Sequence, residues 1–368
     1  MCWRTPDTST CPLSRIKGRR TSFYRRMFSR MEEKDLDEWM HLFMTDVDAA
    51  SEGFGHTPEA FNHPQVVHNS HAIELHDPRV GPSLQLGPLA MFTETPLKPR
   101  GPSPALGQQN AEILGRIKEK KARHPKPSHH PMPKAPLYGV TILEFASWVA
   151  VPLGPSMLAD MGARVIKVEP PGGDPWRGFG AMGLRTLQGK ESVALDLKKP
   201  EGQRIAGELI KRADIVAHNF RPGVPERLDI TYETARALNP GIIYLYGAGY
   251  GSTGPYSHRS VMHPIPGAVA GGALYQAGRG TPPAPDAELT YEEVRRIAQA
   301  LSIANEGNPD VTSAMVVASS LLMALYVRKK TGKGQYLETS MICSNLYANS
   351  DDFSSTRTNP RGFSPTPS

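Results

Sequence analysis

The sequence predicts an α/β protein built on a parallel sheet with flanking helices, together with a smaller, partial α+β lobe. From Leu137 onward, short apolar runs alternate with amphipathic segments, which is typical of parallel strands joined by helices. Before residue 118, helical segments and short strands are instead separated by frequent Gly and Pro. A stretch rich in Pro, Lys and His at 118–136 joins the two parts, and such a composition is typical of an extended linker.

The segment after Leu137 contains runs of strand length and segments with helical periodicity. In chain order we expect strand 140–145, helix 155–161, strand 164–169, strand 192–197, helix 201–212, strand 214–219, helix 232–238, strand 242–246, helix 291–304, helix 311–329 and strand 335–341. A ligand site in such a sheet lies at the carboxyl ends of the strands. Neither G-x-G-x-x-G nor G-x-x-x-x-G-K-[ST] follows the first strand, so no standard dinucleotide or P-loop site is predicted.

The part of the chain before the linker has a different pattern. Apolar side chains recur every three or four residues between 31 and 50, which predicts a helix: Leu36, Trp39, Met40, Phe43 and Val47. Short strands are expected at 72–75, 84–86 and 91–92, and a helix at 110–119. The sequence therefore divides into five parts: a disordered 1–30, the smaller lobe 31–117, the linker 118–136, the main domain 137–350 and a disordered tail 351–368.

Composition and charge narrow the class of protein. The net charge is +6, which makes nucleic acid a partner to consider, but much of the excess lies at 15–30 and 118–134, in the expected disordered and linker segments. We therefore expect no nucleic-acid partner. No continuous apolar run or signal peptide suggests a membrane. The three cysteines, Cys2, Cys11 and Cys343, lack metal-ligand spacing, so a reduced, cytoplasmic location is expected.

Five ordered stretches of the main domain resemble a known family. They are VTILEFASWVAVPLGPSMLADMGARVIKVEPPGGDPWR, GKESVALDLKKPEGQ, ADIVAHNFRPGVPERL, LNPGIIYLYGAGYGSTGPY and ALYVRKKTGKGQYLETSM. With their spacing, residues 137–345 resemble the N-terminal, Rossmann-like half of a family III CoA-transferase, the group that includes formyl-CoA transferase and the CaiB/BaiF proteins. The resemblance implies transfer of coenzyme A between an acyl-CoA and a carboxylic acid.

The smaller lobe resembles the other half of the same family. The matching stretches are EWMHLFMTDVDAA, FNHPQVVHNSHAIELHDPRVG and LGPLAMFTETPLKPRGPSPALGQQNAEIL. The two halves thus stand in the reverse of the family's order. We interpret the chain as an internal piece of two fused units, spanning the end of one and the start of the next. A gene-model artefact or a circular permutation would produce the same order.

By this resemblance, Asp310 in Asn308-Pro-Asp-Val-Thr-Ser-Ala is the catalytic carboxylate, which would attack the thioester and carry the acyl group as a covalent intermediate. The residues alone also fit an Asp that caps the following helix. His263 is the second candidate, because related α-methylacyl-CoA racemases use a His with this Asp to move a proton. Pro264 replaces the racemases' Asp after that His, and Ala314 replaces a glycine that usually follows the catalytic Asp.

The resemblance also implies a CoA site and a partner. The residues that match CoA-lining positions, with Arg177 as a further phosphate contact, are Ser147, Trp148, Val149, Arg177, Lys190, Asn219, Phe220 and Arg227. Coenzyme A is expected as substrate, with no metal or redox cofactor, and the family's assembly implies a homodimer. Two alternatives stay open: a racemase-type isomerase using His263 and Asp310, and a truncated, inactive unit that binds CoA.

Overall fold

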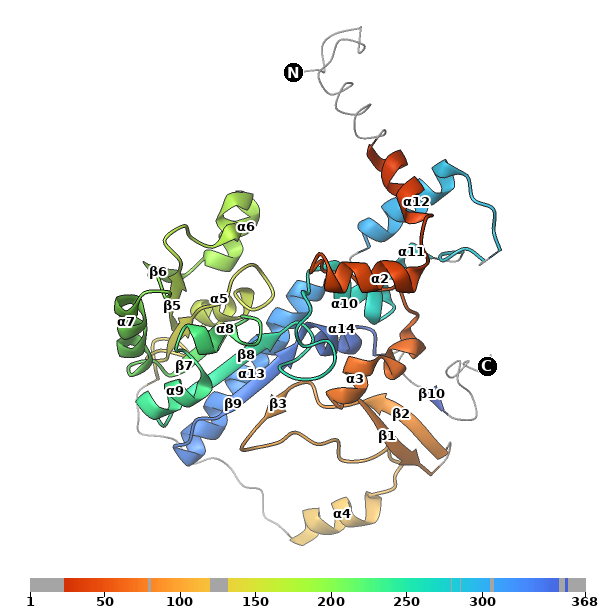
Figure 1. The fold of residues 1–368 in the computed structure, drawn as a ribbon. Coiled ribbons are helices and arrows are strands. Elements are labelled where there is room, and N and C mark those ends of the chain that lie inside the picture. Colours follow the sequence, from red (N-terminus) through yellow and green to blue (C-terminus); the bar gives the residue numbers. More distant parts are fainter. Residues whose placement is uncertain are drawn as a thin grey trace, which may run out of the picture.

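The structure, a computed structural model, describes residues 23–78, 81–119, 132–278, 280–284, 286–304, 308–350 and 355–356. Within these ranges the largest sheet has seven strands in the order β3-β9-β8-β7-β4-β5-β6 (Figure 1). In chain order they are β3 (Met91–Phe92), β4 (Thr141–Glu144), β5 (Arg164–Glu169), β6 (Lys190–Ala194), β7 (Ile215–His218), β8 (Ile243–Ala248) and β9 (Tyr336–Ser340). Six of them pair in parallel, and only β3 runs antiparallel to its neighbour β9.

Helices cover both faces of this sheet, as the alternating pattern predicts. In chain order the helices of the main domain are α5 (Leu153–Asp160), the 3-10 helix η4 (Pro175–Phe179), α6 (Ala181–Leu187), α7 (Pro200–Ile210), α8 (Val224–Arg227), α9 (Tyr232–Leu238), α10 (Pro264–Val269), α11 (Gly272–Ala277), α12 (Tyr291–Ser302), α13 (Pro309–Thr331) and α14 (Met341–Ala348). Strand residues alternate between the two faces. Ile142 packs with α5 and α13, and the next residue, Leu143, packs on the opposite face with α7 and α9.

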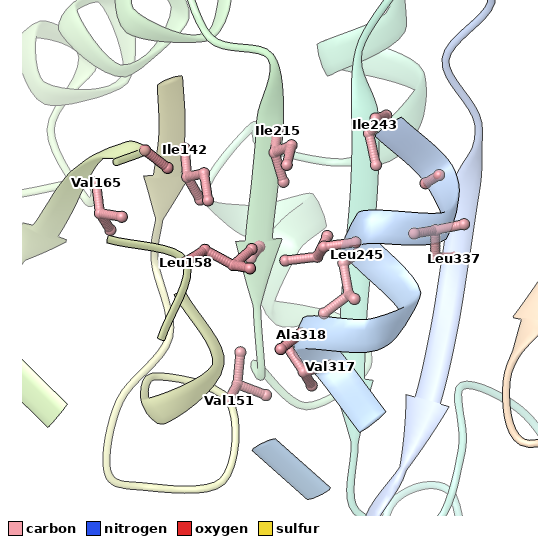
Figure 2. Close-up of a cluster of buried hydrophobic side chains, with 14 of the residues drawn as sticks. Ile142, Val151, Leu158, Val165, Ile215, Ile243, Leu245, Val317, Ala318 and Leu337 are labelled. Carbon is pink, nitrogen blue, oxygen red and sulfur yellow. The ribbon is translucent and has the colours of Figure 1, made fainter. Parts of the chain in front are cut away.

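The long helix α13 lies across one face of the sheet. Figure 2 shows Val317 and Ala318 of this helix directed toward Leu245 of β8. By length and composition alone, α13 could cross a membrane. Much of its surface is nevertheless buried against the sheet, α5 and α14, including Ala314, Val317 and Leu321, which is the position of a core helix.

The smaller lobe contains helices and a second sheet. Its elements are α2 (Leu36–Thr45), the 3-10 helix η3 (Thr57–Asn62), α3 (Pro64–His68), β1 (Ala72–Asp77), β2 (Gly81–Leu86) and α4 (Asn110–Glu119). Strands β1 and β2 pair antiparallel, and β10 (Ser355–Thr356) adds to β2. The lobe also packs directly on the main domain. Phe61 and Val66 share a buried cluster with Tyr250, Ile265 and Leu346.

The α/β prediction is confirmed, with differences in detail. Strand β6 begins two residues before the expected range and ends at Ala194, because Val165–Glu169 of β5 pair with Lys190–Ala194. Residues 23–30, expected to be disordered, lie in a helix that ends at residue 31, and residues 355–356 of the expected disordered tail form β10. The rest of the expected disorder, at 1–22, 351–354 and 357–368, lies outside the described residues, as do the linker residues 120–131.

Candidate active site

A cavity of about 360 Å³ lies at the carboxyl ends of the parallel strands. Loops that follow four neighbouring strands line it: Ser147 comes after β4, Asn219 after β7, Gly249 after β8, and Ser340 ends β9. The cavity therefore occupies the edge of the sheet at which the strand pattern places a ligand site. Of the residues predicted to contact CoA, Ser147, Trp148, Asn219 and Phe220 are brought together here. We call it the carboxyl-edge cavity.

Asn219 joins two of these loops. Its amide oxygen accepts a hydrogen bond from the backbone N–H of Ser147 at 3.0 Å, and its amide nitrogen donates to the carbonyl of the same residue at 2.9 Å. Trp148, which follows, has the left-handed backbone angle φ 69°, rare for a residue with a side chain. Val149 is half-buried beside it, outside the cavity wall. Asn219 thus shapes the loop on which three predicted residues stand.

A network of buried charged side chains lies next to the same loop and supports it. The ammonium of Lys167 lies 2.9 Å from both Glu144 and Asp174, and that of Lys190 lies 2.5 Å from Glu144. Burial alone would lower the pKa of Lys167, but its two carboxylate partners raise it above the ordinary value. For Lys190, burial outweighs the pairing and lowers the pKa. Lys190 does not line the cavity, because its ammonium is enclosed by Glu144 and the carbonyl of Pro152.

The guanidinium of Arg177 also forms an ion pair with a carboxylate. Its Nε and Nη2 atoms donate to Glu169 at 2.7 and 2.5 Å. Burial would raise the pKa of Glu169, but the hydrogen bonds from Arg177 and Ser192 lower it to about 2. Arg227 is exposed at the end of α8 and lies outside the cavity wall. The structure therefore places Arg177, Lys190 and Arg227 outside the cavity wall.

Two cations that the sequence reasoning did not select line the cavity, Arg221 and Arg259. Arg221 donates to Asp48 and to Ser260, both at 2.6 Å. Arg259 is buried, donates to Glu52 at 3.0 Å and lies 4.3 Å from the ring centroid of Tyr256. Arg221 immediately follows the predicted Asn219-Phe220 pair, so its position after a strand was a usable signal. The placement of Arg259 depends on tertiary contacts with the smaller lobe.

Asp310 and His263 meet beside this cavity. Oδ2 of Asp310 lies 2.5 Å from Nδ1 of His263, and their side chains are 19% and 37% exposed. The residue that caps α13 is Asn308, whose side chain accepts from the backbone N–H of Val311. Asp310 is therefore not the cap that the residues alone allowed. It stands in the first turn of α13, where the helix dipole favours a negative charge, one turn before the cavity residue Ser313.

Known CoA-transferases are similar in sequence to this chain. The sequence profile of CoA-transferase family III matches residues 137–365. An acetyl-CoA:oxalate CoA-transferase from Acetobacter aceti is 33% identical over 222 residues, which are 58% of this chain and 53% of the relative. A succinyl-CoA–D-citramalate CoA-transferase from Chloroflexus aurantiacus is 36% identical over 215 residues, 56% of this chain and 49% of the relative.

Among solved structures, a CaiB/BaiF family protein from Brucella suis is 27% identical, with a TM-score of 0.49, over 59% of this chain and 56% of that one. The chain spans about half the length of the curated relatives it matches. The profile match covers more than half of the chain, including the six parallel strands β4 to β9 and both Asp310 and His263. On this ground the chain belongs to CoA-transferase family III.

Proposed function

We propose that this chain transfers coenzyme A between an acyl-CoA and a carboxylic acid, with Asp310 as the covalent nucleophile. The observation that supports this most is the position of Asp310. It stands in the first turn of α13, is not used as the helix cap, and lies one turn from the carboxyl-edge cavity. The relatives named above act on acyl-CoA donors and dicarboxylic acids or hydroxyacids by their names, and the two cavity arginines suit such anions.

In the proposed reaction, the Asp310 carboxylate attacks the thioester carbonyl, the C–S bond breaks, and CoA leaves as thiolate. The product on the enzyme is a mixed anhydride. The acceptor carboxylate then attacks the aspartyl carbonyl of this anhydride, and the donor acid leaves as its carboxylate. The result is a mixed anhydride between Asp310 and the acceptor acid. Attack of the CoA thiolate on the acceptor's carbonyl forms the new acyl-CoA and restores Asp310. Arg221 and Arg259 would hold anionic groups of the substrates in the cavity.

The test is to replace Asp310 with Asn, which keeps the size of the side chain and removes the nucleophile. Acyl exchange is expected to fall by at least about a thousandfold. Hydroxylamine added with acyl-CoA should convert Asp310 of the unmodified protein into a hydroxamate, visible by peptide mass spectrometry. Glu201→Gln is the matched control, because Glu201 is an exposed residue in the first turn of α7. Undiminished exchange in Asp310→Asn would exclude the covalent role.

A second candidate is supported by the contact between His263 and Asp310 at 2.5 Å. In a racemase-type reaction this pair would remove and return the proton next to the thioester carbonyl. That activity requires no acceptor acid. Incubation of an α-methylacyl-CoA in deuterated water would incorporate deuterium at the α-carbon, and His263→Ala would abolish the incorporation. No exchange with a folded protein leaves the transferase proposal as the better one.

The third candidate is a unit that binds CoA without turnover, which the reversed order of the two halves motivates. Calorimetric titration with CoA separates it from the others. Micromolar binding without exchange of any acyl group supports this candidate, and absence of binding by the folded chain argues against all three. We also propose a cytoplasmic homodimer without a resident cofactor, as the family resemblance implies. Sedimentation at the mass of one 40.2 kDa chain would contradict the dimer.

A further inference from the structure

A second cavity, of about 460 Å³, shares Phe220 with the carboxyl-edge cavity. Six of its thirteen lining residues, within the described parts of the chain, carry aromatic rings: His218, Phe220, Tyr232, Tyr244, Tyr246 and Tyr336. We call it the aromatic pocket. Phe220 and Tyr246 belong to both walls, so the aromatic pocket and the carboxyl-edge cavity are neighbours. The proposed reaction uses only the carboxyl-edge cavity and leaves the aromatic pocket without a role.

The rings of the pocket hold one another in place. Tyr232 lies 5.7 Å from Tyr244 and 5.6 Å from Tyr336, centroid to centroid. His218 stacks on Tyr246 at 5.0 Å. The hydroxyl of Tyr244 donates to the carbonyl of Ile230 at 2.6 Å. These contacts make the aromatic wall a rigid surface, prepared before any ligand arrives.

The charged residues that line the pocket have one sign. Glu226 and Glu233 are its charged lining residues, and within the described parts of the chain no Lys or Arg lines it. Burial lowers the pKa of His218 to about 3, so this ring is neutral. Outside the lining, the guanidinium of Arg236 lies 6.0 Å from the centroid of the Tyr232 ring. Among the residues that the structure describes, the carboxyl-edge cavity has the opposite character, because Arg221 and Arg259 line it and no carboxylate does.

From these observations we propose that the aromatic pocket binds a small organic cation, an alkylammonium or quaternary ammonium group on a compact apolar body. The faces of aromatic rings attract cations, and desolvated sites strengthen the attraction. Glu226 and Glu233 add long-range attraction at the rim. The pocket's volume lies within the range of small-molecule sites. This inference does not depend on CoA transfer, because it concerns a different cavity with different charges.

The experiment is a pair of titrations of the whole chain, with choline and with 3,3-dimethylbutan-1-ol, followed by calorimetry and by saturation-transfer NMR. The two molecules have the same shape, and only choline is charged. Choline is expected to bind at least about tenfold more tightly than the neutral molecule. Saturating CoA should leave this binding in place, since CoA is expected in the neighbouring cavity. Equal binding of both molecules, or no binding of choline, overturns the proposal.

Variants locate the binding. Glu226→Gln and Glu233→Gln change exposed side chains, so the fold should be retained while choline affinity falls by about three- to tenfold in the double variant. Tyr232→Leu should reduce it further by removing a ring face. Glu201→Gln and Tyr275→Leu, an exposed tyrosine away from this pocket, are the matched controls. Choline binding that survives the Glu226 and Glu233 changes contradicts a small-cation site in this pocket.

Discussion

Asp310 and Asn308 show how two similar side chains, two positions apart, take different roles. Asn308 accepts from the backbone N–H of Val311, which satisfies the start of α13. The carboxylate of Asp310 is thereby left to face His263 instead of its own helix. From the sequence, a cap and a nucleophile could not be told apart, because Asn and Asp are equally good capping residues. Only the folded backbone shows which of the two side chains points back to the helix.

At the residue scale, Glu144 is the carboxylate on which two buried lysines depend. Changing Glu144 to Gln leaves Lys167 with one fewer partner and Lys190 with none of opposite charge among its contacts. Breaking a buried ion pair in this way costs about 3–5 kcal/mol. We therefore expect a large drop in the free energy of unfolding measured in urea. Glu208→Gln, which alters an exposed ion pair on α7, should leave the urea midpoint unchanged.

Two buried histidines predict how stability depends on pH. Burial lowers the pKa of His71 to about 4 and that of His218 to about 3, from an ordinary value of 6.5. The unfolded chain therefore binds more protons than the folded one below pH 6.5, so stability falls as the pH drops from 6.5 toward 4. By pH 4, each histidine has lowered the free energy of unfolding by on the order of 3 kcal/mol.

The measurement is urea unfolding of the unmodified chain and of His71→Gln between pH 7 and pH 4.5. The variant removes one titrating group, so its stability should decline less steeply with acidification. His41→Gln, which changes an exposed histidine of α2, is the control. Parallel slopes for the unmodified chain and His71→Gln would show that His71 is accessible to protons in the folded state.

At the scale of elements, α5 and α13 approach so closely that only a glycine fits between them. A Cβ on Gly154 would lie 2.6 Å from Cγ1 of Val317 and 3.2 Å from the carbonyl oxygen of Ala314. Gly154→Ala should therefore force the helices apart and cost about 1–3 kcal/mol in thermal or chemical unfolding. Because Ser313 and Val317 line the carboxyl-edge cavity, CoA affinity should fall as well.

Gly115→Ala is the matched control for this change. Gly115 lies in the helix α4, and nothing stands within 4 Å of a Cβ built there. The substitution should stabilise slightly, since Ala is the better helix former by about 1 kcal/mol. A Gly154→Ala variant as stable as the control would mean that α5 can shift without loss of packing.

The bounds of individual strands and helices show how much of the fold sequence patterns can predict. The strand 164–169 and the helix 232–238 have the predicted bounds, because each is a strongly patterned run with a clear start and end. Strand β6 is displaced, since its position follows from pairing with β5 and not from its own residues. The short helices α6, α10 and α11 were not predicted. Their glycines and prolines, such as Gly183, Pro266 and Gly272, are poor helix formers whose conformation depends on packing.

At the scale of the whole molecule, the smaller lobe and the main domain share a hydrophobic core. Phe61 and Val66 of the lobe lie in one buried cluster with Tyr250, Ile265 and Leu346 of the main domain, and β3 extends the parallel sheet at β9. Phe61→Ala should cost about 3–5 kcal/mol. Unfolding followed by tryptophan fluorescence and by far-ultraviolet circular dichroism should remain a single coincident transition.

Hydrogen exchange provides the second readout for Phe61→Ala. If the two parts fold as one unit, amides of β8 in the main domain should exchange faster in the variant, although Phe61 lies in the other part. Phe54→Ala, which changes an exposed phenylalanine of the same lobe, is the control. Faster exchange confined to residues 57–86 would show that the lobe opens independently.

By itself, the sequence determined the α/β architecture and the edge of the sheet that holds the cavity, which follow from periodicity in local segments of the chain. Its resemblance to a known family singled out Asp310 and His263. The tertiary structure alone decided that Lys190 and Arg177 are held by Glu144 and Glu169 while Arg221 and Arg259 line the cavity. The physical reason is that the partner of a charged side chain is set by burial and by contacts between distant segments, which no local pattern encodes.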